Sequence, residues 1–175
     1  MEIQRQDFEG FVSLFKRNVH EALGSVKDDP MFKRLSEEYS QVTCTQEFNN
    51  WETFESIYLT GKSKIWVIRD KNQTVIASVG LTIKETHGEI VRLYVDQKHT
   101  RKGYGNMLMK TAVEHGLSND CKKIILLTPS SNEGGIVFYK KMGFIEMGRH
   151  VFELQGKKTN LRILSMMYKD QKVLP

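Results

Sequence analysis

The pattern of apolar and polar positions predicts three helices in the first third of the chain. An apolar stripe at helical spacing begins at Asp7 and stops before Gly24. Asp29 followed by Pro30 is typical of a helix start, with the proline in the first helical position. Asn50 is a third candidate cap, ahead of a short aromatic stretch. We interpret its aromatic residues as core, with a surface that receives an amine as the alternative.

Shorter apolar runs in the middle of the chain predict strands. The runs Lys64–Arg69 and 74–84 are separated by a tight turn, and a second turn leads into the run 90–95. Such short connections favour an antiparallel meander. An amphipathic helix from Gly105 then leads to a compact run at 123–128. Because a helix joins them, the strands 90–95 and 123–128 are predicted to be parallel.

The last part of the chain is again predicted to form a helix followed by strands. A helix over 132–142 is predicted to end at Gly143, and strands over 144–154 and 161–168 form a hairpin. Residues 2–5 are a possible opening strand. The predicted fold class is α/β: a single domain with a mixed, mostly antiparallel twisted sheet, a central parallel βαβ unit, and helices on both faces.

Composition narrows the functional classes. The 175 residues are 39% apolar and 27% charged, as expected for one soluble globular domain. The net charge of +5 fits an anionic partner such as a phosphorylated cofactor, or only a basic surface. Basic residues are spread along the chain, with no arginine-rich arm and no zinc-finger spacing, so nucleic acid is not the expected partner.

Two cysteines without metal-ligand spacing indicate neither a disulfide framework nor a metal site. The polar start and the lack of a long apolar run give no sign of a signal peptide or a membrane span. We therefore expect no metal and no membrane partner. The expected compartment is the cytoplasm, without excluding the nucleus.

The strongest candidate for a binding site follows the strand 90–95. A turn with four basic side chains leads into Gly103-Tyr104-Gly105, and a helix begins there. A glycine turn at a helix start directs unpaired backbone N–H groups and the positive end of the helix dipole at one point, which predicts a pyrophosphate cradle. Leu108 stands where the dinucleotide fingerprint needs a glycine, and no Walker-type phosphate loop is present.

Two segments together resemble the GNAT superfamily of acyl-CoA N-acyltransferases. That family's phosphate-binding turn, Gln/Arg-x-x-Gly-x-Gly/Ala after a strand ending in Leu-x-Val, corresponds to Thr100–Gly105 after Leu93-Tyr94-Val95. Its later helix pattern corresponds to Asn132, Gly135, Phe138, Tyr139, Gly143 and Phe144. Thr100 departs from the usual Gln or Arg, and Gly135 from the usual alanine. The order of strands and helices agrees along essentially the whole chain.

The resemblance implies a set of site residues. Acetyl-CoA would bind to Leu93, Tyr94, Val95, Thr100, Arg101, Lys102, Gly103, Tyr104, Gly105, Asn106, Asn132 and Tyr139. The N–H of Val95 would stabilise the oxyanion, and Tyr139 would protonate the departing thiolate. Asn132 would either contact the pantetheine arm or cap its own helix. The general base would be Glu89, with Glu85, Asp96 or a water chain as substitutes.

The function implied is an N-acetyltransferase that moves an acetyl group from acetyl-CoA to a primary amine by direct attack in a ternary complex. The alternative is a catalytically inert acyl-CoA-binding regulatory module. Within one domain over 1–175, acceptor-side helices would occupy about 7–60, the acetyl-CoA-binding core about 63–145, and the hairpin about 144–168. The acceptor stays open among a small amine such as a polyamine, an amino acid, a protein lysine and a protein N-terminus. The edge of the terminal hairpin makes a homodimer possible.

Overall fold

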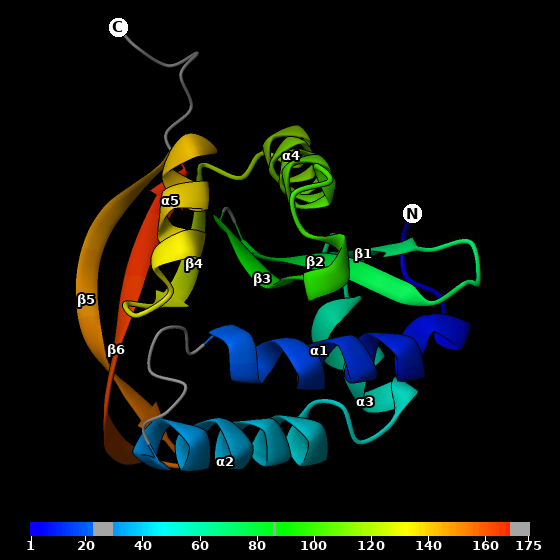
Figure 1. The fold of residues 1–175 in the computed structure, drawn as a ribbon. Helices are drawn as coiled ribbons and strands as arrows, with labels where there is room; N and C mark the ends of the chain where they lie inside the picture. The colour runs from blue at the N-terminus through cyan, green and yellow to red at the C-terminus, as the bar shows by residue number, and fades with distance from the viewer. Residues whose placement is uncertain (23–29, 86, 169–175) are drawn as a thin grey trace, which may run out of the picture.

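A six-stranded mixed sheet forms the centre of the protein, in the order β1-β2-β3-β4-β6-β5 (Figure 1). The computed structural model describes residues 1–22, 30–85 and 87–168. The strands are β1 (Lys64–Arg69), β2 (Val75–Lys84), β3 (His87–Val95), β4 (Lys123–Pro129), β5 (Phe144–Leu154) and β6 (Lys157–Tyr168). Only β3 and β4 pair in parallel, and every other pair is antiparallel. The predicted fold class is confirmed.

Helices cover both faces of this sheet (Figure 1). They are α1 (Phe8–Ala22), α2 (Pro30–Gln46), α3 (Trp51–Tyr58), α4 (Tyr104–Ser118) and α5 (Glu133–Lys141), with short 3-10 turns η1 (Arg5–Asp7) and η3 (Gln97–His99). One apolar cluster joins α1 and α3 to the sheet through Phe11, Phe15 and Phe54. The other joins α4 to the opposite face through Leu108, Met109 and Ala112. Burial of these two apolar stripes positions the helices on opposite sides of β3.

The element boundaries follow the predicted pattern with small differences. Residues 2–5 form an isolated bridge between Glu2 and Trp66, and then the turn η1 rather than a strand. The hairpin turn is shorter than predicted, so β6 begins at Lys157. Pro30 is the first residue of α2, whereas Gly24 and Asp29 lie outside the described residues. The Asn50 side chain accepts a hydrogen bond from the Thr53 N–H at 2.8 Å, as a helix cap does.

A β-bulge in β3 changes which way its side chains point. The β2–β3 register passes from Ser78–Tyr94 to Gly80–Val91, so β3 carries one extra residue there. Arg92 lies in this bulge with a φ of 54°, and the buried Ser78 hydroxyl donates to its carbonyl oxygen at 2.9 Å. Leu93 consequently packs on the α4 face, while Arg92 bonds to α2 and α3 on the other.

Candidate active site

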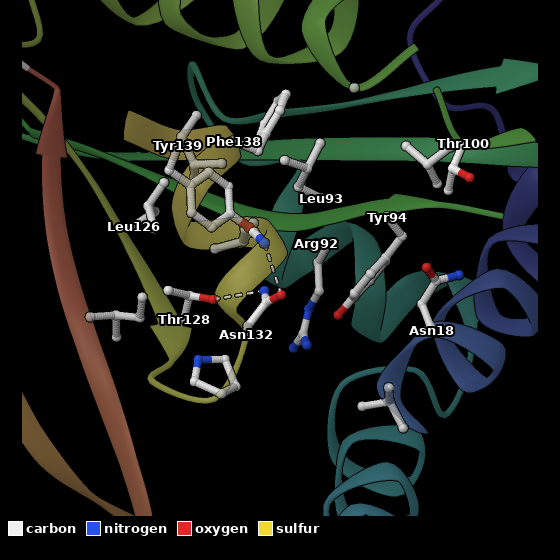
Figure 2. Close-up of a pocket in the computed structure, with 18 of the residues that line it drawn as sticks. Asn18, Arg92, Leu93, Tyr94, Thr100, Leu126, Thr128, Asn132, Phe138 and Tyr139 are labelled. Carbon is white, nitrogen blue, oxygen red and sulfur yellow. Dashed lines mark hydrogen bonds between the residues drawn. The ribbon is translucent and has the colours of Figure 1, made fainter. Parts of the chain in front are cut away.

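A cavity of about 1020 Å³ passes between β3 and β4. The registered pairing of these strands ends at Ile90–Leu126, and beyond it the cavity occupies the space between them. The walls include residues from α1, α2, the turn before α4, α5, β5 and β6. Figure 2 shows Tyr139 and Phe138 in one part of the wall and Arg92 and Tyr94 in another. Both faces of the sheet therefore contribute to one cavity.

The predicted cradle lies in the wall of this cavity at the start of α4. Asp96 holds the turn by accepting a hydrogen bond from the Lys98 N–H at 3.1 Å. Gly103 occupies the N-cap position with a φ of 84° and provides no capping side chain. The first N–H groups of α4 therefore have no side-chain partner at the cap and are available to an anion.

Most predicted cradle residues line the cavity: Thr100, Arg101, Gly103, Tyr104, Gly105 and Asn106. Lys102 is exposed and is not among the lining residues. The Thr100 hydroxyl donates to the Gln97 carbonyl at 2.9 Å, so it stabilises the turn in place of the longer side chain that the family pattern has there. Arg101 takes a φ of 59°, a conformation that residues other than glycine rarely adopt.

Two buried polar atoms near the predicted cradle and the start of α5 have no hydrogen-bond partner within the described residues. Among the described residues, His99 Nδ1 and Ser131 Oγ are buried side-chain atoms without a hydrogen-bond partner. His99 lines the cavity next to the cradle, and Ser131 directly precedes the cap of α5. A buried polar atom without a partner is unfavourable unless a ligand or water satisfies it. These atoms and the free N–H groups of α4 fit a phosphorylated, amide-bearing cofactor such as acetyl-CoA.

The end of β3 presents both side chains and backbone to the cavity. Leu93, Tyr94 and Val95 all line it, with Tyr94 on the α1 face, where its ring lies 5.9 Å from that of Phe15. The Asp96 N–H donates to the Ile76 carbonyl of β2 at 2.8 Å. Because successive N–H groups of a strand point to opposite neighbours, the Val95 N–H points away from β2, toward the opening between β3 and β4.

Tyr139 lies in the wall that α5 contributes. Burial raises its pKa to about 12, with the nearby Tyr94 phenol adding to the increase and a hydrogen bond to Thr128 opposing it. Thr128 also accepts a hydrogen bond from Asn132 Nδ2 at 3.0 Å, and Asn132 Oδ1 accepts one from the Gly135 N–H at 3.1 Å (Figure 2). The hydroxyl of Tyr139 is therefore protonated across the neutral pH range.

The packing around Asn132 accounts for Gly135. A Cβ at position 135 would lie 2.2 Å from Asn132 Nδ2, much closer than any real contact. Asn132 occupies the space that an alanine methyl would need, while its side chain caps α5. In this structure, glycine at position 135 leaves room for the Asn132 side chain in its capping position.

The three candidate bases occupy different environments. Glu89 lines the cavity from β3, on the face that carries Tyr94. Asp96 is engaged by the Lys98 N–H and by an ion pair with Arg17 at 3.2 Å. Glu85 is exposed directly after the end of β2 and does not line the cavity. Of these three carboxylates, Glu89 alone faces the cavity.

Sequence reasoning missed Arg92, which is the centre of a charged network in the wall. Its guanidinium donates to the Tyr39 hydroxyl at 2.9 Å, to the Tyr58 hydroxyl at 2.7 and 2.9 Å, and to the Glu47 carboxylate. Only 10% of the Arg92 side chain is exposed. Buried charges are tolerated when they are paired and hydrogen-bonded in this way.

Aromatic rings enclose the same guanidinium. Its central carbon lies 5.1 to 5.6 Å from the ring centres of Phe15, Phe48 and Tyr58. Burial alone would lower the pKa of Arg92, but the surrounding phenols and the Glu47 carboxylate raise it, so the group stays charged. The one sequence signal was a lone arginine within an apolar strand, whose partners lie 34 to 53 positions earlier in the chain.

The predicted aromatic segment around Asn50 is core. Phe48, Phe54 and Tyr58 are buried, and Phe54 stacks on Phe11 with ring centres 5.2 Å apart. The acidic residues of α2 and α3 that are described, Glu37, Glu38, Glu52 and Glu55, are exposed. Asp28 and Asp29 lie outside the described residues.

Within the described ranges 1–22, 30–85 and 87–168, no group of three or more His, Cys, Asp or Glu side chains is arranged to hold a metal ion. No helix in the same ranges combines the length and the apolar content needed to cross a membrane.

Comparison with solved structures shows the fold. PaiA N-acetyltransferase from Thermoplasma acidophilum in complex with coenzyme A superposes with a TM-score of 0.69 at 19% identity, over 97% of this chain and 96% of that chain. Ribosomal-protein-alanine N-acetyltransferase from Brucella melitensis superposes with a TM-score of 0.66 at 14% identity, over 95% of this chain and 96% of that chain. At these identities the similarity concerns the fold alone.

Comparison with curated sequences adds the family. N-alpha-acetyltransferase 30 from Xenopus laevis is 29% identical over 112 residues, which are 63% of this chain and 38% of the relative. Human N-acetyltransferase 8 is 22% identical over 63% of this chain and 52% of the relative. The chain therefore spans about a third to a half of the length of these relatives. The sequence profile of the acetyltransferase (GNAT) family matches residues 29–144, more than half of the chain. The chain belongs to the acetyltransferase (GNAT) family, as its two motif segments predict.

Proposed function

We propose that this chain transfers an acetyl group from acetyl-CoA to a primary amine by direct attack in a ternary complex. The observation that carries the proposal is the single cavity that connects the cradle at α4, the opening between β3 and β4, and the α1–α2 face of the sheet. A donor and an acceptor that enter from opposite faces would meet between the two strands. The family supports this chemistry, and both named curated relatives are N-acetyltransferases.

The cofactor side would be held by the N–H groups at the start of α4 and by the backbone of β3. The pyrophosphate would lie against the N–H groups from Arg101 to Asn106, where Lys102 adds positive charge from the solvent side. Asn132 would remain a helix cap, a contact to the pantetheine arm, or both. Acetyl-CoA supplies the acetyl group as a thioester, which the bound amine attacks.

The transfer is balanced by two proton movements. The amine nitrogen forms a bond to the carbonyl carbon while the carbon–sulfur bond breaks, and sulfur leaves with the electron pair. The Val95 N–H would stabilise the oxyanion, and Glu89, directly or through water, would take the proton that the nitrogen loses. Because burial raises the pKa of Tyr139 to about 12, its hydroxyl is protonated at neutral pH and would give its proton to the departing thiolate, regaining one from solvent afterwards. The products are an N-acetyl amine and free CoA thiol.

The test measures thiol release with an amine panel, together with acetyl-CoA affinity by calorimetry. Tyr139→Phe should lower kcat by about 10²-fold or more while the Kd for acetyl-CoA changes little. Tyr168→Phe is the matched control, because this half-buried tyrosine packs on Phe144 and does not line the cavity. Equal turnover of Tyr139→Phe and wild type would remove Tyr139 from the chemistry. Binding of acetyl-CoA without turnover of any amine would instead identify the inert module.

The same proposal extends to the division of the domain. Residues 7–60 would form the acceptor side, 63–145 the acetyl-CoA-binding core, and 144–168 a hairpin that completes the acceptor side. A homodimer through the edge strand β5, where Ile145 and Met147 are exposed, stays a prediction. So does a cytoplasmic location, which the two free cysteines, Cys44 and Cys121, support.

A further inference from the structure

The part of the cavity on the α1–α2 face is lined mostly by uncharged side chains, with Glu89 and Arg92 of β3 as the charged residues. The uncharged ones include Asn18, Val19, Leu35, Tyr39, Phe152 and Ile163, from α1, α2, β5 and β6. Figure 1 shows α2 below the sheet near the turn end of the β5–β6 hairpin, with α4 on the opposite face. An acceptor that reaches the opening between β3 and β4 from this side must pass these residues.

Several of these side chains keep apolar surface that a ligand would cover. Leu35, Tyr39, Phe152 and Ile163 are all half-buried. Tyr39 and Phe152 meet edge to face, with ring centres 5.9 Å apart, and so join α2 to β5 across the cavity wall. Aromatic and aliphatic walls of this kind bind apolar groups by removing their surface from water.

Charge is scarce among the described lining residues at this end. The one carboxylate of the described cavity wall is Glu89, which the proposed chemistry uses for the reacting nitrogen. Among the described lining residues, a second ammonium of a polyamine would therefore find no further carboxylate to offset the hydration it loses. The guanidinium of Arg92 is bonded to Glu47, Tyr39 and Tyr58, so it is not free to bind the carboxylate of an amino acid.

We infer that the acceptor is a primary amine whose remaining part is an uncharged apolar arm, of the size of an aromatic or branched aliphatic side chain. The inference rests on the proposed acetyl transfer and specifies its substrate class. Such an arm would lie against Tyr39 and Phe152, and its amine would reach Glu89. A small arylalkylamine and a peptide with an apolar first residue share this chemistry.

Matched pairs of amines that differ by one charge test the inference on the wild-type protein. Pentylamine should be acetylated with a kcat/KM about tenfold or more above that of 1,5-diaminopentane, because the second ammonium has no partner. Leucinamide should exceed leucine by a similar factor. Equal or reversed preference in either pair overturns the inference and leaves acetyl transfer intact. No turnover with any amine overturns the proposed function itself.

Phenethylamine and a peptide that begins with Leu then identify the source of the amine. Faster acetylation of either compound than of 1,5-diaminopentane and leucine supports the inference. The compound that reacts shows whether the apolar arm belongs to a small amine or to a peptide. A peptide whose first residue is Glu is the control for the peptide. If the Glu peptide and the Leu peptide react equally and phenethylamine does not react, the apolar arm is not recognised and the inference fails.

Variants locate the arm in the cavity. Phe152→Ala should lower kcat/KM for phenethylamine about tenfold and leave the Kd for acetyl-CoA unchanged, since a buried aromatic contact is lost. Met147→Ala is the control, because Met147 lies on the same strand, is exposed and does not line the cavity. Phe152→Glu should reverse the preference between pentylamine and 1,5-diaminopentane. If neither Phe152 variant changes the amine preference while the thermal melt shows a folded protein, the arm does not lie there.

Discussion

The two ends of the cavity, which we propose to be a cofactor end at α4 and an acceptor end on the α1–α2 face, are built by different means. The cofactor end is a local segment: a turn held by Asp96, a glycine with positive φ, and the first N–H groups of a helix. The acceptor end is assembled from α1, α2, α3, β3, β5 and β6, and its most connected residue, Arg92, bonds to partners 34 to 53 positions away. The first end depends on backbone conformation, and the second on side chains that tertiary packing brings together. Substitutions at the two ends should therefore have different effects on stability and on ligand binding.

The largest effect is expected from Arg92→Met. The change leaves the Glu47 carboxylate and two tyrosine hydroxyls without their shared donor. Removing one partner of a buried ion pair destabilises proteins by about 3–5 kcal/mol, and the partial exposure of Glu47 places this case at the lower end. Urea unfolding measures the loss.

Arg149→Met is the matched control for that change. Arg149 pairs with Glu146 at 3.1 Å with 66% of its side chain exposed, and surface pairs contribute roughly 0–1 kcal/mol. Similar unfolding midpoints for the two variants would contradict a structural role of the Arg92 network. A double variant with Glu47→Gln measures the coupling between the two residues directly.

The next largest effect is a loss of stability at alkaline pH, and it comes from tyrosines that are buried in the folded chain. Burial raises the pKa of Tyr58, Tyr94 and Tyr139, and that of Tyr139 reaches about 12. Unfolded tyrosines ionise near pH 10, so the folded chain binds more protons above that pH and stability falls as the pH rises. The part due to Tyr139 is roughly 2–3 kcal/mol between pH 10 and 12.

Urea unfolding of wild type and Tyr139→Phe across this alkaline range checks the prediction. The variant should lose stability less steeply, because it lacks one of the protons that the folded state retains. Parallel slopes for the two proteins would show that Tyr139 ionises as readily in the folded chain as in the unfolded one. That result would also remove the reason for keeping Tyr139 protonated near the thiolate.

A smaller loss of stability is expected from an alanine at the glycine turn of the cofactor end. Comparing stability with acetyl-CoA affinity there separates backbone strain from ligand binding. Gly103→Ala places a side chain at a φ of 84°, which costs about 1–2 kcal/mol of stability although no atom lies within 4 Å of the new Cβ. The relaxed turn should also weaken acetyl-CoA binding several-fold in calorimetry. Gly61→Ala is the control, because Gly61 has a φ of 59° and equal free space but lies outside the cavity. Equal acetyl-CoA affinities of the two variants would argue against the cradle.

The difference between the two ends also explains what the sequence could predict. The antiparallel β1–β2–β3 meander, the parallel β3–β4 pair and the terminal hairpin follow from turn residues and local periodicity, which neighbouring residues determine. The glycine turn at the start of α4 is equally local, whereas its role as a cradle stays a prediction. The network around Arg92 was not predicted because strict alternation in β3 would place Arg92 on the same face as Ile90. The bulge adds one residue, so Arg92 points to α2 and α3 while Ile90 packs on the α4 side. Nothing in the local pattern indicates that extra residue.

Gly135 shows the same limit on a smaller scale. The pattern identified a glycine where the family usually has alanine, but it gave no reason. In the structure the Asn132 side chain fills the space beside Gly135, where it accepts a hydrogen bond from the Gly135 N–H and donates one to Thr128. This placement involves a hydrogen bond to Thr128 of β4, an element separate from α5, so the sequence around Gly135 alone does not predict it.

The smallest effect is expected from the neighbouring glycines of α5 and decides the role of Asn132. Gly134→Ala adds a methyl group with nothing within 4 Å and should stabilise the helix by roughly 0.5–1 kcal/mol. Gly135→Ala has the same gain in helix propensity but displaces Asn132, whose cap contributes about 1 kcal/mol. Its unfolding midpoint should therefore fall below that of Gly134→Ala.

Acetyl-CoA affinity then shows whether Asn132 is a helix cap alone or also contacts the pantetheine arm. If Asn132 only caps α5, both variants bind acetyl-CoA with the wild-type Kd, whereas a contact to the pantetheine arm makes Gly135→Ala alone bind more weakly. Equal midpoints and equal affinities would mean that Asn132 moves without consequence for either the helix or acetyl-CoA binding.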